Sequence, residues 1–261
     1  MKRYLLILLL ALLPVEAFSQ AQIITRRERL KDFGQKMTLV VLTGNELYDS
    51  ILRESVRRVW TASAYEFCTS SDFEARMTSP QWYFLVSVRT LHKGEAGGGT
   101  YFLTLLKGGA PELDKLPEVA SLPVCPADGL SGREGTYMPA IIGCLQRYAS
   151  EYASGAKTHL VRRRILRGTA MVDTADISPE AMAFAQKSGT VMTGSGIGDK
   201  AMEERTEGCL STYTITGTPG SFCYKMVFDA GTHELLWLGK HRTGTSGRPA
   251  GFLKGDLRRF R

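Results

Sequence analysis

The chain has 261 residues, of which 43% are hydrophobic and 23% are charged, and its formal net charge is +7. This composition excludes an intrinsically disordered chain, and the length allows one or two domains with a hydrophobic core. The positive balance favours anionic partners, and the compartment in which the chain works decides which anions it can meet.

The first twenty residues predict export. Lys2 and Arg3 precede an apolar run over 4–13, and the small side chains of Val15 and Ala17 offer a signal-peptidase site. We interpret residues 1–20 as a signal peptide; an uncleaved membrane anchor is the alternative, although the run is short for one. No later apolar segment approaches ~20 residues, so we expect no transmembrane segment after cleavage. The expected location is the periplasm, the outer membrane surface or the cell exterior.

Residues 21–155 predict an α/β domain. An apolar run at 39–42 is typical of a buried strand, and Asn45 is a suitable N-cap for an amphipathic helix that reaches Trp60. We expect a second strand at 65–68, a brief helix at 72–77 with a capping box of Ser71 and Glu74, and a hairpin of strands 82–91 and 100–107. A helix that links two strands requires a crossover, so this part predicts parallel pairing with an antiparallel hairpin added.

The rest of the chain is less regular in pattern. Residues 108–135 are rich in proline and glycine and are interpreted as an irregular connection or linker, and helices are expected at 137–153 and 159–167. Residues 156–261 are interpreted as an α+β carboxy-terminal part that could complete the same fold. In this part a helix begins at Ser178-Pro179, and strands are expected at 210–215, 222–228 and 234–238. No internal repeat is evident, and the predicted fold class is mixed α/β, with a βαβ crossover, antiparallel hairpins and helices on the sheet.

The cysteines number five, so at least one has no partner within the chain. Cys209 and Cys223 flank a predicted turn and form the first candidate disulfide; Cys125 with Cys144 is the competing pair. Buried cysteines without any bridge are an equal alternative. No pair has the C-x-x-C spacing of a metal site, so no metal is expected at the cysteines.

Positive charge gathers near the carboxy terminus, where Asp256 is the only acid after residue 239. A second basic cluster occupies 162–167, at Arg162, Arg163, Arg164 and Arg167. Export argues against nucleic acid, and the aromatic residues of a single-strand platform are missing, so we expect an envelope protein or an anionic surface as partner; a solvated face is the alternative. Removal of 243–261 is expected to leave the core folded. The candidate contact residues are Lys240, Arg242, Arg248, Lys254, Arg258, Arg259 and Arg261.

The stretch "TGSGIGDKA" at 193–201 suggests a phosphate loop, but the pattern fails. A P-loop that starts at Gly194 requires glycine where Asp199 stands and a hydroxyl where Ala201 stands. Ser195 lacks the glycines of a nucleophile elbow. We therefore expect no nucleotide and no cofactor, and interpret the stretch as a turn or hinge in which Asp199 caps or opens a short helix.

Other catalytic and metal patterns are equally weak. A group of Asp229, His233, Glu234 and His241 near one hairpin could hold a metal, but hairpin ends collect polar residues in any case and no H-x-H or H-E-x-x-H spacing is present. No local signature supports a Cys–His pair. No catalytic, cofactor-binding or metal residue is therefore assigned.

Two long segments carry a resemblance. The stretch "KMTLVVLTGNELYDSILRESVRRVWTASAYEF…SPQWYFLVSV", followed by "CYKMVFDAGTHELLWLGKHR…GFLKGDLRRF", is similar to uncharacterised exported proteins of Bacteroidota. The first ~100 residues also resemble, in pattern only, the amino-terminal α/β domain of TolB and the module of CsgG-type envelope proteins. That resemblance implies protein contacts and envelope assembly, and it carries no functional residue over to this chain.

The expected function is that of an exported, non-catalytic envelope protein, an interaction or assembly module. The alternatives are an exported hydrolase-like enzyme with an unrecognised site and a binder of anionic envelope surfaces. A pocket in which Ser195 or a cysteine lies within hydrogen-bond reach of a histidine would favour the enzyme.

Overall fold

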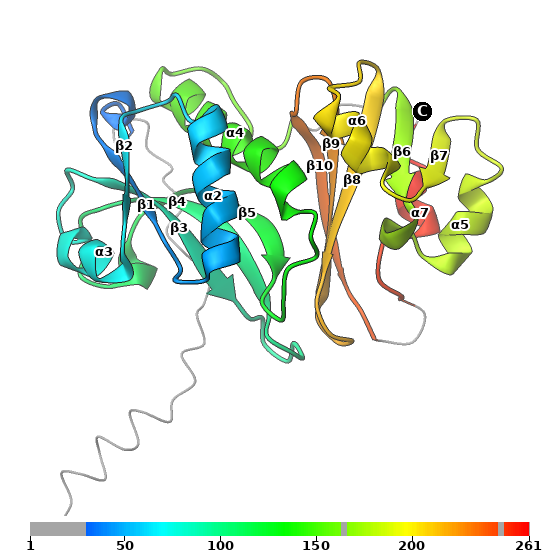
Figure 1. Cartoon of the computed structure of the whole chain (residues 1–261), viewed down its shortest axis with the longest axis horizontal. Coiled ribbons are helices and arrows are strands. Elements are labelled where there is room, and N and C mark those ends of the chain that lie inside the picture. The colour runs from blue at the N-terminus through cyan, green and yellow to red at the C-terminus, as the bar shows by residue number, and fades with distance from the viewer. Residues whose placement is uncertain (1–29, 163–165, 245–247, 261) are drawn as a thin grey trace, which may run out of the picture.

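The computed structural model describes residues 30–162, 166–244 and 248–260. The fold is mixed α/β, as predicted, with two five-stranded sheets that each combine parallel and antiparallel pairs (Figure 1). The predicted signal peptide, Arg163, Arg164 and Arg261 lie outside the described residues. Among the helices that the structure describes, none is long and apolar enough to cross a membrane.

The first sheet and its helices form unit 1, residues 38–153. The strands lie in the order β2-β1-β3-β4-β5, with β1 parallel to β2 and β3 and the remaining pairs antiparallel. The elements in chain order are β1 (Thr38–Val41), α2 (Glu46–Val59), β2 (Tyr65–Cys68), α3 (Ser70–Arg76), β3 (Tyr83–Thr90), β4 (Thr100–Lys107), β5 (Glu118–Pro126) and α4 (Glu134–Ala153).

The second sheet belongs to unit 2, residues 169–257, which repeats the topology of unit 1. Its strand order is β10-β9-β8-β6-β7, with β6 parallel to β7 and β8 and the rest antiparallel. The chain therefore contains a structural repeat that its sequence does not reveal. The elements are β6 (Thr169–Asp173), α5 (Pro179–Ala185), β7 (Val191–Gly194), α6 (Ile197–Glu203), β8 (Cys209–Thr216), β9 (Phe222–Asp229), β10 (Leu235–Arg242) and α7 (Lys254–Leu257).

Local capping signals explain where two helices begin. The Asn45 side chain accepts a hydrogen bond from the amide of Tyr48 at 3.0 Å, and Ser178 caps α5 with Pro179 at its first position. Both predictions are confirmed. In α3 the capping box consists of Thr69 and Asp72, so the predicted box of Ser71 and Glu74 is wrong.

Three other expectations are corrected. Residues 118–126 form β5, an edge strand of sheet 1, where proline is tolerated because one side of the strand has no ladder to complete. The parallel strands β6 and β7 were not expected. Residues 159–162 and 166–167 form no helix, although one was predicted at 159–167.

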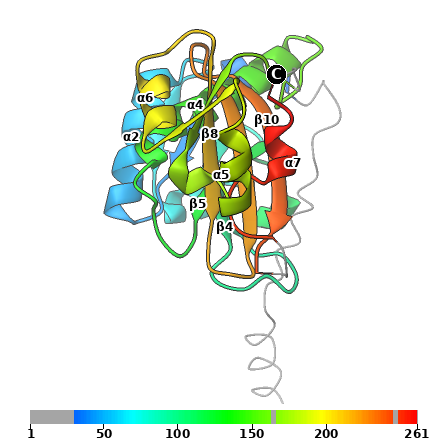
Figure 2. The same cartoon turned by 90° about the vertical axis from the view of Figure 1, so that its right-hand side faces the viewer.

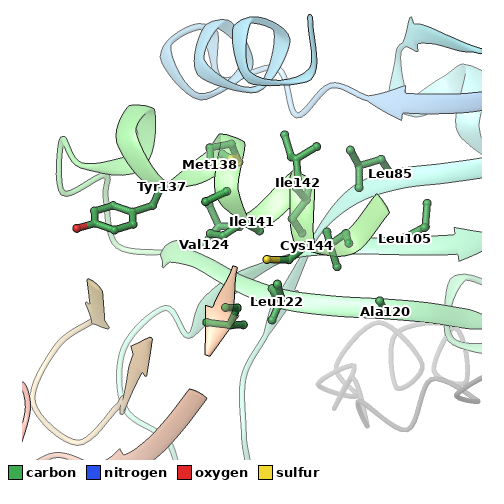
Figure 3. Packing of buried hydrophobic residues seen from close by; sticks show 14 of the residues in the cluster. Leu85, Leu105, Ala120, Leu122, Val124, Tyr137, Met138, Ile141, Ile142 and Cys144 are labelled. Atoms are coloured by element: carbon green, nitrogen blue, oxygen red, sulfur yellow. The ribbon is translucent and has the colours of Figure 1, made fainter. Parts of the chain in front are cut away.

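The largest core cluster joins both units through α4. Figure 3 shows Ile141 and Ile142 packed over Leu122 of sheet 1, while the ring of Tyr137 extends from the same helix in another direction. That ring stacks on Tyr213 of β8, with centroids 4.2 Å apart. Because each fully buried large apolar side chain contributes about 1.5–3 kcal/mol, α4 stabilises both units at once.

Candidate functional site

A buried ionic cluster lies at the junction of the two units. Arg133, just before α4, donates to Asp199 of α6 through Nε at 2.9 Å and to Asp176 through Nη1 at 2.8 Å. Asp176 also accepts from the hydroxyl of Thr212 at 3.0 Å, and the Tyr137 hydroxyl lies 2.8 Å from Asp199 Oδ1. The two carboxylates are thus held in unit 2 by a cation from unit 1.

The electrostatics of this cluster point to a structural role. Burial raises the pKa of Asp176, which is 1% exposed, and Arg133 opposes that rise. Burial also disfavours the charge of Arg133, but the hydrogen bond to Asp199 and the attraction of Asp176 raise its pKa overall. Since each charged group is paired and hydrogen-bonded, the cluster fastens the units together and leaves no group available for a ligand.

The glycine-rich stretch at 193–201 forms one side of this junction. The amide of Gly196, in a left-handed conformation, donates to Asp173, and α6 begins at the next residue. At Gly198 a Cβ would lie 2.9 Å from the hydroxyl of Ser211 and 3.0 Å from the carbonyl of Met171. The turn and short helix are as expected, but Asp199 is not their cap, because its carboxylate binds Arg133.

The predicted basic contact residues divide between two places. Lys240 and Arg242 lie on β10, where the Lys240 ammonium is 4.9 Å from the centre of the Phe222 ring and Arg242 Nε donates to the Gly220 carbonyl at 3.2 Å. The other described members lie around α7: Arg248, Lys254 and Arg258 are exposed, and Arg259 lies 5.4 Å from the ring of Trp237.

The carboxy-terminal segment is part of the core of unit 2. Phe252, Leu257 and Phe260 are buried with side chains of β8 and β9, and Lys225 of β9, 3% exposed, pairs with Asp256 at 2.5 Å. Removal of 243–261 would therefore open this core. The expectation that such a deletion leaves the core folded is wrong.

The five cysteines are buried and free, so the candidate disulfide is absent. Cys209 opens β8, whereas Cys223 lies opposite Thr216 at the other end of that strand. Seven residues of extended strand separate the two positions by roughly 20 Å, well beyond disulfide range. Burial raises the pKa of Cys68 to about 11 and that of Cys125 to about 12, which keeps both groups as thiols.

The histidines considered for chemistry are engaged elsewhere. His241 lies at the far end of β10 from Asp229, and its Nε2 donates to the Pro249 carbonyl at 2.8 Å. Cys144 contacts the backbone carbonyl of His233, at 3.6 Å, and not its ring. Within the described ranges no serine or cysteine hydrogen-bonds a histidine ring, and no three His, Cys, Asp or Glu side chains gather as a metal site.

Sequence reasoning missed a groove between the units, which we name the junction groove. Two adjoining cavities of about 300 and 190 Å³ share Val59, Pro139, Arg205 and His233, so they form one depression between α2 and α4 of unit 1 and α6 and the β9–β10 turn of unit 2. Burial lowers the pKa of His233, and the nearby Arg205 and Arg58 lower it further. The groove is thus lined by the guanidinium groups of Arg58 and Arg205, the imidazole of His233, and the carboxylates of Glu203 and Glu234.

A separate pocket of about 190 Å³ lies beyond the end of β1, between Tyr48, Tyr101 and Cys125. The amides of Thr43 and Gly44 beside it donate to the carboxylate of Asp49 at 2.8 and 2.9 Å. The Asp49 carboxylate therefore already occupies these two loop amides beside the pocket.

Comparison with known proteins adds no assignment: no family model, no curated protein and no solved structure matches the chain. The resemblances to exported Bacteroidota proteins and to TolB and CsgG-type domains remain predictions.

Proposed function

We propose that the chain is an exported, non-catalytic interaction module whose basic carboxy-terminal face docks on an anionic surface of the cell envelope. The supporting observation is an ion pair: Asp256, the only acid after residue 239, is paired with the buried ammonium of Lys225. The exposed cations Lys254 and Arg258 therefore have no acid of their own segment to neutralise them. Their backbone is already ordered in and beside α7, so less conformational entropy is lost when they bind.

The histidines and cysteines considered for an enzymatic role have other partners or are buried. The described cysteines are buried, and each of His92, His233 and His241 has a ring nitrogen in a hydrogen bond with Tyr224 or a backbone carbonyl. In the described ranges no serine or cysteine hydrogen-bonds a histidine ring, so the one arrangement that would have favoured the hydrolase-like alternative is not found there. Export itself is inferred from residues 1–20.

The test is charge reversal on α7. The double variant K254E/R258E should weaken binding to vesicles that contain phosphatidylglycerol by ~30-fold or more, because each cation near an anionic surface contributes about 1 kcal/mol. Both side chains are exposed, so the fold should be unchanged. Binding is measured by vesicle flotation at fixed ionic strength, with neutral phosphatidylcholine vesicles for comparison.

A matched control reverses two exposed lysines that lie outside unit 2, K31E and K157E. This variant changes the net charge by the same amount and should keep most of the binding. If the control loses as much affinity as the α7 variant, or if the unaltered chain fails to float with anionic vesicles, the assignment of this face is wrong.

A further inference from the structure

Two residues of the junction groove occupy backbone positions that favour glycine. Within the described part of the chain, Arg205 and His233 are the non-glycine residues with positive φ, at 52° and 61°. Both line the groove. A left-handed conformation is costly for a side chain with a Cβ, and strained residues of this kind cluster at functional sites.

Arg205 occupies a position at the end of α6 where the backbone conformation alone would favour glycine. It directly follows the C-cap of α6, where the amide of Thr206 donates to the Ala201 carbonyl at 3.0 Å and that of Arg205 approaches the Met202 carbonyl at 3.4 Å. This is the hydrogen-bond pattern of a helix end that glycine normally completes. The chain instead places a guanidinium group at the groove, at a conformational cost.

His233 is fixed on the same side of the groove. Its Nε2 donates to the carbonyl of Met202 at 2.9 Å, and its amide donates to the Asp229 carbonyl at 2.8 Å, so both ring and backbone are held. The imidazole thereby links the β9–β10 turn to α6. This contact keeps Arg205 and the turn at a fixed separation and makes the groove a pre-formed feature of the junction.

The groove contains uncompensated positive charge. In the described ranges, the exposed side chains of Arg58 and Arg205 form no ion pair or hydrogen bond. Of the two acids in the lining, Glu234 lies 3.3 Å from Arg162, whereas Glu203 accepts from the neutral Thr136 hydroxyl at 2.9 Å and keeps its negative charge. One unpaired carboxylate therefore stands against the two guanidinium groups, which leaves an excess of positive charge. The two guanidinium groups are therefore available to a ligand.

Helix ends explain part of this arrangement. Arg58 stands in the last turn of α2 and Arg205 follows α6, and cations are stabilised at the carboxyl ends of helices. That effect accounts for positive charge at both places. It does not account for arginine at the left-handed position after α6, where glycine would end the helix without strain and a neighbouring residue could carry the charge.

We propose that the junction groove binds a phosphate group between the guanidinium groups of Arg58 and Arg205. Guanidinium groups present forked donors that match phosphate oxygens, and two arginines from opposite sides of a groove suit a doubly charged tetrahedral anion. The cavities of about 300 and 190 Å³ exceed the size of the free ion. The space beside Val59, Pro139 and Ala140 can accept the organic part of a phosphomonoester.

The test is calorimetric titration of the full chain with inorganic phosphate and, separately, with glycerol 3-phosphate, at pH 7.5 and constant ionic strength. We expect saturable binding that R205G and R58A each weaken at least tenfold. Tighter binding of glycerol 3-phosphate than of phosphate identifies a monoester site, and equal affinity identifies a site for the free ion; both support the proposal. R205G should also melt no lower than the unaltered chain, because glycine relieves the strained φ.

The matched control is R57A, which removes a neighbouring arginine whose guanidinium lies 5.7 Å from the centre of the Phe67 ring, on β2. R57A should bind as the unaltered chain does. Absence of saturable binding, or equal loss in R57A, overturns the proposal, as does unchanged affinity in R205G. The α7 variant K254E/R258E should retain phosphate binding, so failure of this site is distinguishable from failure of the proposed docking face.

Discussion

The two units have one topology and stabilise it differently. In unit 1 the sheet is covered by α2 and α4, of 14 and 20 residues, whereas the equivalent helices of unit 2, α5 and α7, have 7 and 4. The opposite face of sheet 2, which carries Tyr213 and Phe228, packs into the large cluster that α4 also enters. Figure 2 shows the short helices α5 and α7 of unit 2 on the side that faces the viewer. Because these helices cover little of sheet 2, unit 2 relies on unit 1 for much of the burial of its apolar side chains.

The largest expected effect comes from separating the units at Arg133. Arg133→Met keeps most of the side-chain volume but leaves Asp176 and Asp199 without their cation. Breaking a buried ion pair in this way costs about 3–5 kcal/mol. Unfolding in urea should show this loss, and unit 2 should unfold before unit 1, because unit 1 keeps its own long helices. Hydrogen exchange would resolve the two units.

The control for this experiment is Arg147→Met on the same helix, whose pair with Glu151 is partly exposed and should be worth less than about 1 kcal/mol. Adding Asp176→Asn and Asp199→Asn to Arg133→Met should restore part of the stability, since no buried charge is then left unpaired. A cost no larger than that of the control would show that the cluster does not hold the units together.

A smaller loss is expected when α7 is released from sheet 2. Asp256→Ala leaves the ammonium of Lys225, 3% exposed, without its partner at 2.5 Å. We expect a cost of about 2 kcal/mol, below that of a fully buried pair because Asp256 is 16% exposed. Amide exchange should accelerate in unit 2 and stay unchanged in β1 and β3. Glu180→Ala, an exposed change on α5, serves as control, and equal acceleration in both variants would contradict the role of α7.

The comparison also shows which features the sequence carries. Strands and helices with local signals were predicted, as with the N-cap Asn45 and the Ser178-Pro179 helix start. β5 was missed because proline marks a break in most strands, yet the open side of an edge strand tolerates it. The repeat is hidden because the equivalent helices differ so much in length that no sequence period survives.

The sites were harder to predict than the elements. The ionic cluster joins Arg133 to residues 43 and 66 positions further along the chain, so no local pattern could reveal it. The junction groove depends on the same docking of the units. One local signal was available: Arg205 stands after a short helix, where glycine is usual. The basic residues around α7 were predicted from composition, but not the buried Phe252 and Phe260 that fix them in place.

The smallest expected effect concerns the segment that precedes each first strand. In unit 1, Asp32 braces this segment by accepting from Tyr83 at 2.6 Å and from Lys107 at 2.9 Å. In unit 2 the corresponding contact is an isolated bridge of Leu166 with Phe260. The first brace depends on charge and the second does not, so pH should distinguish the units.

Burial disfavours the charge of Asp32, but its hydrogen bonds to Lys36, Tyr83 and Lys107 lower its pKa from 3.8 to about 2. A lowered carboxyl pKa stabilises the folded state above the unfolded value, and this contribution is lost as pH falls from 3.8 through about 2. Asp32→Asn should therefore cost about 1 kcal/mol near pH 6, after allowance for partial exposure, and only a small part of that near pH 2. Urea unfolding at both values measures the difference, with the exposed change Asp114→Asn as control; a cost that persists unchanged at pH 2 would mean that the brace depends on shape and not on charge.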